Sequence, residues 1–240
     1  MPLQQGKAIQ KVLSTNSPIR YASKLGGLFL LLYLGEGIFL SQLLKIVPFY
    51  WIYDFFGLLI FPVCAYLYLI RKGIFSKRDF GWQPLRKSFY SAKDLIFDTL
   101  ILLFIWFVCF AVLYRLLLSS ALSEYLSAPV LGSVRPSSGI GWFVVGIYWC
   151  IQPALIEESF FRGFMKSFFD AVPLGSHRTF LYATVSGLLF GIGHLPQGGG
   201  TVLVASILGF AFCFQYVRIK HAGPFVVVHF VGNFYSLFLQ

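Results

Sequence analysis

Seven apolar runs dominate this sequence, and each has close to the roughly 20 residues that a helix needs to cross a lipid bilayer. They lie at residues 24–44, 50–70, 95–118, 141–167, 179–195, 201–217 and 222–239. Charged residues make up only 12% of the chain, whereas soluble domains carry about 25%. We therefore predict an all-α, polytopic integral membrane helix bundle of about seven transmembrane helices. Residues 119–130 could add an eighth, as a short amphipathic helix at the membrane surface.

The distribution of lysine and arginine predicts how the chain is oriented. Basic loops stay on the cytoplasmic side of a bilayer, and a cytoplasmic N-terminus leaves only Lys45, Arg115 and Arg135 of the 19 basic residues outside. The net charge of +10 is therefore interpreted as membrane topology, and no nucleic-acid partner is expected. Residues 1–20 are polar and lack the apolar core of a removable signal peptide. Little of the chain lies outside the spans, which favours the bacterial cytoplasmic (inner) membrane, with the lipid bilayer as a constant partner.

Two adjacent acids and an arginine lie in the fourth predicted span, where each charge costs roughly 2.5–3.5 kcal/mol and needs a partner or a purpose. Glu158 and Arg162 are four residues apart, so their side chains meet on one face of a helix. Glu157 points about 100° away around the helix and is free of that ion pair. We interpret Glu158 and Arg162 as structural and electrostatic support, and the desolvated Glu157 carboxylate as a candidate general base.

Two histidines occupy similar positions in later spans. His194 follows Phe190 by four residues, and His229 precedes Asn233 by four, so the second pair presents two donors from one helical face. At ~1.5 Å of rise per residue, His194 would lie deeper in the membrane than Glu157 and His229. The glycines at 187, 191 and 193 could let its helix bend or break, and so bring the three side chains together.

Three further acids lie in predicted spans. Asp54 and Asp98 are within about a turn of helix ends, where headgroups can solvate them, so we interpret both as structural. Glu36 lies between two glycines that allow close helix contact, and we expect its side chain to be hydrogen-bonded or neutral.

The motifs EExxxR, FxxxH and HxxxN, each on its own apolar helix and in this order, resemble those of the CPBP family. This is the CAAX-protease and bacteriocin-processing group of intramembrane endopeptidases, which includes the type II CAAX prenyl proteases. Here the motifs read Glu157-Glu158 with Arg162, Phe190 with His194, and His229 with Asn233. The resemblance covers residues 139–240, which we expect to form the catalytic helical core. Residues 1–138 hold N-terminal transmembrane helices and a basic cytoplasmic loop, without a signature.

The resemblance implies hydrolysis of a peptide bond in a membrane-associated protein or peptide by a glutamate-activated water. Glu157 and His194 would position and deprotonate that water, while His229 and Asn233 would donate to the tetrahedral oxyanion. Glu158 and Arg162 would support the helix and its electrostatics, and Phe190 would pack within its motif. No cofactor is implied. Family members process prenylated C-terminal motifs, leader peptides or C-terminal sorting helices, and nothing in this sequence distinguishes these substrates.

Two alternatives stay open at this point. Two histidines and a carboxylate could bind zinc with an open fourth position, although the HExxH helix of zinc proteases is absent and the four cysteines lie singly. The chain could also be a non-catalytic immunity or transport protein, although the internal repeats common in transporters are not visible. We expect a glutamic-type endopeptidase without a metal.

Overall fold

The computed structural model describes residues 18–43, 52–82, 91–114 and 139–238. These residues form helices and short connections, with no strand among them. The predicted all-α helix bundle is therefore confirmed, while the number of spans stays a prediction. The surface helix suggested at residues 119–130 lies outside the described residues.

The helices follow the predicted apolar runs, and three of them change between α- and π-helical geometry along their length. The first part contains α2 (Pro18–Leu43), then η1 (Tyr53–Ile60) continuing as α4 (Phe61–Arg71), the short turn η2 (Lys77–Phe80), and α5 (Ala92–Phe107) continuing as η4 (Val108–Tyr114). The second part contains α8 (Gly139–Glu158) continuing through η6 (Ser159–Phe164) into α9 (Met165–Ala171), the turn η7 (Gly175–His177), α10 (Arg178–Gly193), the turn η8 (Leu195–Gln197), α11 (Gly199–Ile219) and α12 (Gly223–Phe238).

Three helical stretches in the described part are long and apolar enough to cross a membrane by length and composition. They are Tyr53–Arg71, Gly139–Ala171 and Gly199–Ile219. Large apolar side chains also lie on the outside of the bundle, for example Ile140, Phe143 and Val144 on α8. A contiguous apolar exterior of this kind suits lipid rather than water as the surrounding solvent. The chain is an integral membrane protein.

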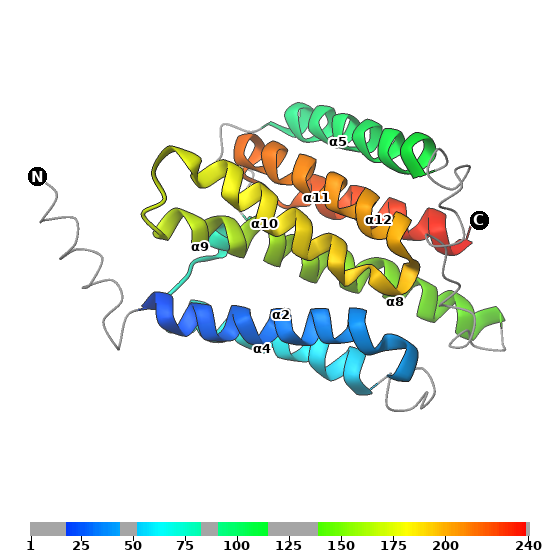
Figure 1. The fold of residues 1–240 in the computed structure, drawn as a ribbon, viewed down its shortest axis with the longest axis horizontal. Coiled ribbons are helices and arrows are strands. Elements are labelled where there is room, and N and C mark those ends of the chain that lie inside the picture. The colour runs from blue at the N-terminus through cyan, green and yellow to red at the C-terminus, as the bar shows by residue number, and fades with distance from the viewer. Residues whose placement is uncertain (1–17, 44–51, 83–90, 115–138, 239–240) are drawn as a thin grey trace, which may run out of the picture.

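The polar motifs lie in the middle of the bundle. Figure 1 shows α2 and α4 side by side at one edge, α5 at the opposite edge, and α8, α10, α11 and α12 between them. α8 packs against α12, α10 against α11 and α2, and α5 against α12. Since the three motifs are on α8, α10 and α12, this arrangement surrounds them with protein on both sides.

Glycines in α10 allow it to pack closely on α11. A Cβ at Gly187 would lie 2.7 Å from the backbone nitrogen of Phe210, and one at Gly191 would overlap the Ser206 side chain. Gly209 of α11 faces Gly187 in return. α10 is continuously helical through Gly187 and Gly191, so the helix does not break at either glycine, and its small residues allow backbone contact.

Part of the predicted basic loop folds back onto the helices. Trp82 donates from its indole nitrogen to the Ser159 hydroxyl (2.9 Å). A Cβ at Gly163 would overlap the Phe80 backbone, so this glycine is needed for the contact. Gly81 has a left-handed backbone (φ 82°), and its carbonyl accepts a hydrogen bond from the Ala222 backbone (2.9 Å). The segment after α4 is thus held between η6 and the start of α12.

Candidate active site

Glu158 joins two of the three motifs. It is the last residue of α8, at the point where the helix widens into the π-helical turn η6, a geometry often found at functional sites. Its Oε2 lies 2.8 Å from Nε of Arg162, and its Oε1 lies 2.8 Å from Nδ1 of His229 on α12. Glu158 and Arg162 are both fully buried, so each carboxylate oxygen of Glu158 has a positively charged or proton-donating partner inside the protein.

Arg162 is enclosed by aromatic rings as well as by Glu158. Its guanidinium carbon lies 4.7 Å from the centre of the Phe190 ring and 5.5 Å from that of Phe212. A desolvated guanidinium gains from the negative face of an aromatic ring. The Tyr182 hydroxyl fixes the same helical turn by donating to the Arg162 backbone carbonyl (3.1 Å). The ion pair predicted from the i, i+4 spacing is therefore present in a packed, aromatic environment.

His194 lies at the end of α10 rather than within it. The helix stops at Gly193, two residues earlier than predicted, and continues as the turn η8 up to Gly198, whose φ is 95°. The His194 backbone N–H bonds to the Gly191 carbonyl, and its ring Nδ1 lies 2.8 Å from the Phe190 carbonyl. Because a carbonyl only accepts hydrogen bonds, Nδ1 carries the proton and Nε2 presents a lone pair when the ring is neutral.

Phe190 lies between the two histidines. Its ring centre is 4.8 Å from that of His194 and 5.9 Å from that of His229. Since it also contacts Arg162, the FxxxH phenylalanine is the packing centre of the three motifs. His194 is therefore linked to His229 and Arg162 through the ring of Phe190.

Among the described residues, the buried Oε2 of the Glu157 carboxylate has no hydrogen-bond partner. Oε2 of Glu158 also lacks a hydrogen bond, but it lies 2.8 Å from Nε of Arg162 in the ion pair. An unpaired buried oxygen of a carboxyl group costs free energy unless a water or a substrate group completes its bonding. Glu157 is therefore separate from the Glu158–Arg162–His229 network, as the helical spacing predicts, and open to a further partner.

Asn233 and His229 both face α8 from α12. The Asn233 amide donates to the Trp149 carbonyl (3.3 Å), while His229 bonds to Glu158. An amide nitrogen has two hydrogens, so this contact leaves one for another acceptor. The predicted shared face is present, and each residue already has one partner on α8.

Asp54 and Asp98 are buried, so the expected solvation by headgroups is wrong. Asp54 accepts a hydrogen bond from the Tyr148 hydroxyl (2.6 Å). Asp98 on α5 forms an ion pair with Arg218 near the end of α11. Partners from other helices replace water at both positions, and the sequence of a single helix could not reveal them.

Tyr33 is the site residue that the sequence analysis missed. It is buried, and its hydroxyl donates to the Phe190 carbonyl (3.2 Å), the same oxygen that accepts from His194. Its ring covers Gly193, where a Cβ would overlap it. A polar aromatic residue in an apolar helix, three residues before Glu36, was the only local signal.

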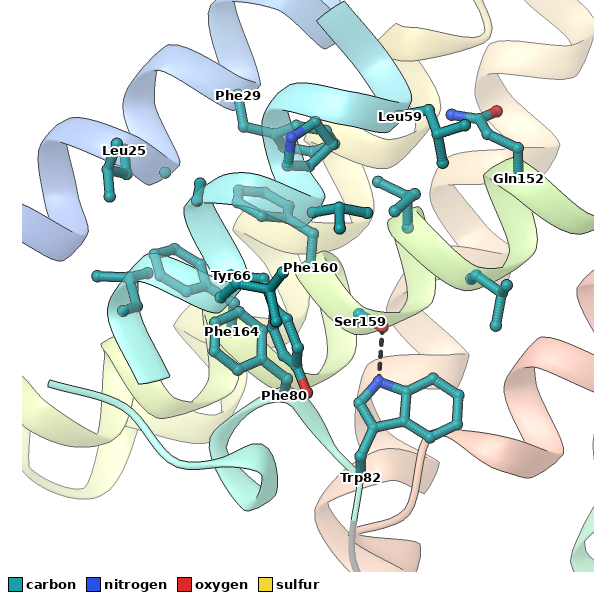
Figure 2. A pocket seen from close by; sticks show the side chains of 18 of the residues that line it. Leu25, Phe29, Leu59, Tyr66, Phe80, Trp82, Gln152, Ser159, Phe160 and Phe164 are labelled. Atoms are coloured by element: carbon teal, nitrogen blue, oxygen red, sulfur yellow. Dashed lines mark hydrogen bonds between the residues drawn. The ribbon is translucent and has the colours of Figure 1, made fainter. Parts of the chain in front are cut away.

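An apolar pocket of about 650 Å³ lies beside the site, between α2, α4 and the outer face of α8 and η6. Figure 2 shows Phe29, Phe160 and Phe164 along its wall, with the Trp82–Ser159 hydrogen bond near one end and Gln152 near the other. The Phe29 and Phe160 rings are in contact (4.4 Å between centres). Phe160 follows Glu157 by three residues, so the pocket borders the helical turn that carries the candidate base.

No three His, Cys, Asp or Glu side chains within the described ranges are grouped so that they could hold a metal ion. The four cysteines are free thiols. The site as described therefore consists of two glutamates, two histidines, an asparagine, an arginine and a tyrosine.

Residues 139–235, which carry all three motifs, match the family model described as type II CAAX prenyl endopeptidase Rce1-like. This part of the chain is similar to the Rce1-like family. The match agrees with the family resemblance of the motifs and supports an intramembrane endopeptidase, a hydrolase that acts on a membrane-associated protein or peptide. No curated protein and no solved structure matches the chain.

Proposed function

We propose that this Rce1-like chain is a glutamic-type intramembrane endopeptidase in which Glu157 and His194 activate the attacking water. The observation that carries the proposal is the buried Glu157 oxygen, which has no hydrogen-bond partner in the described part of the chain, next to a Glu158 whose two oxygens face Arg162 and His229. A water bound there would donate one hydrogen to Glu157 and the other to Nε2 of His194. Glu157 then takes the proton as the water oxygen attacks the peptide carbonyl, and later gives it to the leaving amine.

His229 and Asn233 are proposed as the donors that stabilise the oxyanion. Nδ1 of His229 is engaged by Glu158, so the ring can donate from Nε2 only when both nitrogens are protonated. The negative charge of the Glu158 carboxylate would stabilise this doubly protonated ring. Asn233 would use its second amide hydrogen. Removing one oxyanion donor typically costs ~10²–10³ in rate.

Glu158 and Arg162 are proposed to hold the site rather than to react. Both are fully buried and form an i, i+4 ion pair, which leaves neither accessible to a substrate. Their role would be to fix the orientation of His229 and the position of η6, and so the direction in which Glu157 points.

The proposed location is the bacterial cytoplasmic membrane, with the N-terminus in the cytoplasm. Support comes from the way the basic helix ends gather: Figure 1 shows the start of α2, the start of α10 and the end of α11 at the same end of the bundle. Those ends carry Arg20, Arg178 and Arg218, as expected for a positively charged cytoplasmic side.

The decisive experiment compares all protein termini in the membrane and secreted proteomes of cells carrying the wild type or Glu157→Gln. Termini that disappear in the variant, while the variant is inserted at normal amounts, would establish proteolysis and identify the substrate with its cleavage sequence. Unchanged termini with a stably inserted variant would favour a non-catalytic immunity or transport role.

Independence from metal is a separate prediction of this mechanism. Since a carboxylate and an imidazole activate the water, chelators should leave cleavage of an identified substrate unchanged. The measurement is activity of purified protein before and after chelation, together with its zinc content by elemental analysis. Stoichiometric zinc whose removal abolishes cleavage would replace the glutamate mechanism by a zinc-dependent one.

A further inference from the structure

α2 lies outside the matched residues 139–235, yet it contributes a side chain to the motif residues. Tyr33 approaches the end of α10 from the side of α2, with its ring against Gly193 and in edge contact with Phe161 (5.2 Å between centres). Both its hydroxyl and its ring are buried. The position of this tyrosine is therefore set by packing on both motif helices.

The hydroxyl of Tyr33 meets the backbone group that orients His194. The last four carbonyls of a helix lack the usual intrahelical partner, and at the end of α10 the Phe190 carbonyl accepts from Nδ1 of His194 (2.8 Å) and from Tyr33 (3.2 Å). These two bonds use both lone pairs of the oxygen. The direction of the His194 ring, and hence of Nε2, thus depends on an oxygen that Tyr33 holds in place.

The bond to the Phe190 carbonyl uses the hydrogen of the Tyr33 hydroxyl. A tyrosine hydroxyl has one hydrogen and can also accept. We propose that Tyr33 is a positioning residue for His194, which fixes the direction of the His194 ring by holding the Phe190 carbonyl in place. This inference rests on the proposed function, in which His194 and Glu157 activate the attacking water.

The test compares Tyr33→Phe with Tyr53→Phe. Tyr53 is a matched control because its hydroxyl also donates to a backbone carbonyl, that of Leu32 on α2, but it belongs to the contact between α2 and η1. Tyr33→Phe should lower kcat/KM roughly tenfold or more and move the pH at which activity is half-maximal, while Tyr53→Phe changes neither. If the variant only folded less well, its activity would fall by the same factor at every pH and the midpoint would stay in place. A shifted midpoint therefore indicates a positioning role rather than a loss of folded protein. p-Aminophenylalanine at position 33, which restores a donor, should recover most of the activity.

A second readout is independent of cleavage. Protein labelled with ¹⁵N-histidine in detergent gives ring-nitrogen NMR signals for its four histidines, and the His194 signals are assigned by their loss in His194→Gln. Tyr33→Phe should shift them and Tyr53→Phe should not. Unchanged His194 signals, or equal effects of the two variants on the pH midpoint, would overturn the role of Tyr33. If the wild type cleaves nothing but Tyr33→Phe still shifts the His194 signals, the proposed function is refuted, while the contact of Tyr33 with the Phe190 carbonyl is supported.

Discussion

Glu157 and Glu158 are neighbours in sequence with opposite surroundings. The two oxygens of Glu158 face Arg162 and His229, whereas a buried oxygen of Glu157 has no hydrogen-bond partner among the residues that the structure describes. The step of about 100° between successive helical residues turns one side chain towards α12 and the other away from the ion pair. A paired carboxylate contributes to folding, and an unpaired one keeps its bonding capacity for a ligand.

These surroundings predict different consequences for two otherwise identical substitutions. Glu158→Gln leaves the Arg162 charge buried without its partner, and breaking a buried pair costs about 3–5 kcal/mol, so the yield of folded protein and the activity should both fall. Glu157→Gln breaks no ion pair, so the yield of folded protein should be preserved. Cleavage should be abolished, because glutamine cannot take the proton from the attacking water. Monodisperse yield in detergent and thermal unfolding, measured beside cleavage, test this. Equal losses of yield in both variants would show that the two glutamates do not divide their roles in this way.

Local spacing explains which contacts the sequence could predict. The Glu158–Arg162 pair follows from i, i+4 geometry within one helix. The contacts between Glu158 and His229, and between Tyr33 and Phe190, join residues 71 and 157 positions apart, and only the packing of the helices creates them. The early end of α10 had a local signal, since Pro196 follows His194 closely and helices tend to stop before a proline.

At the scale of elements, the close contact of α10 and α11 positions the second motif. Small residues let the two backbones approach, and close packing is a main source of helix association in a lipid environment. α10 then delivers His194 at its end, where the chain turns through η8 into α11. The position of the histidine therefore depends on the helix pair as a unit.

Two glycine-to-alanine substitutions test this dependence, because they should change the unfolding temperature in opposite directions. In Gly187→Ala the new Cβ would lie 2.7 Å from the Phe210 backbone, and overpacking of this kind costs about 1–3 kcal/mol, so the protein should unfold at a lower temperature. In Gly27→Ala on α2 the Cβ meets none of the described residues within 4 Å. Alanine favours the helix by up to about 1 kcal/mol, so this protein should unfold at a higher temperature. Thermal unfolding of both in the same detergent is the measurement. Similar shifts in both proteins would contradict close α10–α11 packing.

At the scale of the whole molecule, elements outside the family match complete the surroundings of the site. α2 brings Tyr33 to α10, and α2 and α4 form one side of the apolar pocket whose other side is α8. The pocket borders the turn of Glu157 and has an almost entirely apolar lining. It is therefore suited to an apolar part of a membrane-associated substrate.

Filling this pocket should weaken substrate binding. Ala65 on α4 lines the pocket, and Ala65→Trp should raise KM by about tenfold with kcat little changed, as expected when apolar contacts in a pocket are lost. Leu100→Trp is the control, because Leu100 is exposed on α5 at the opposite edge of the bundle. Steady-state kinetics on the substrate identified from the proteome comparison provide the measurement. An unchanged KM in Ala65→Trp would show that the substrate does not occupy the pocket.

The contact between η6 and the segment after α4 limits which parts of related chains can be combined. Gly163 and Ser159 belong to the family-matched region, but their surfaces are shaped to receive Phe80 and Trp82 from the other half of the chain. A chimera that joined residues 139–240 to a foreign N-terminal half would leave a groove over Gly163 and an unbonded hydroxyl at Ser159. Recombination between relatives should therefore preserve function only where residues 80–82 and η6 come from the same parent protein.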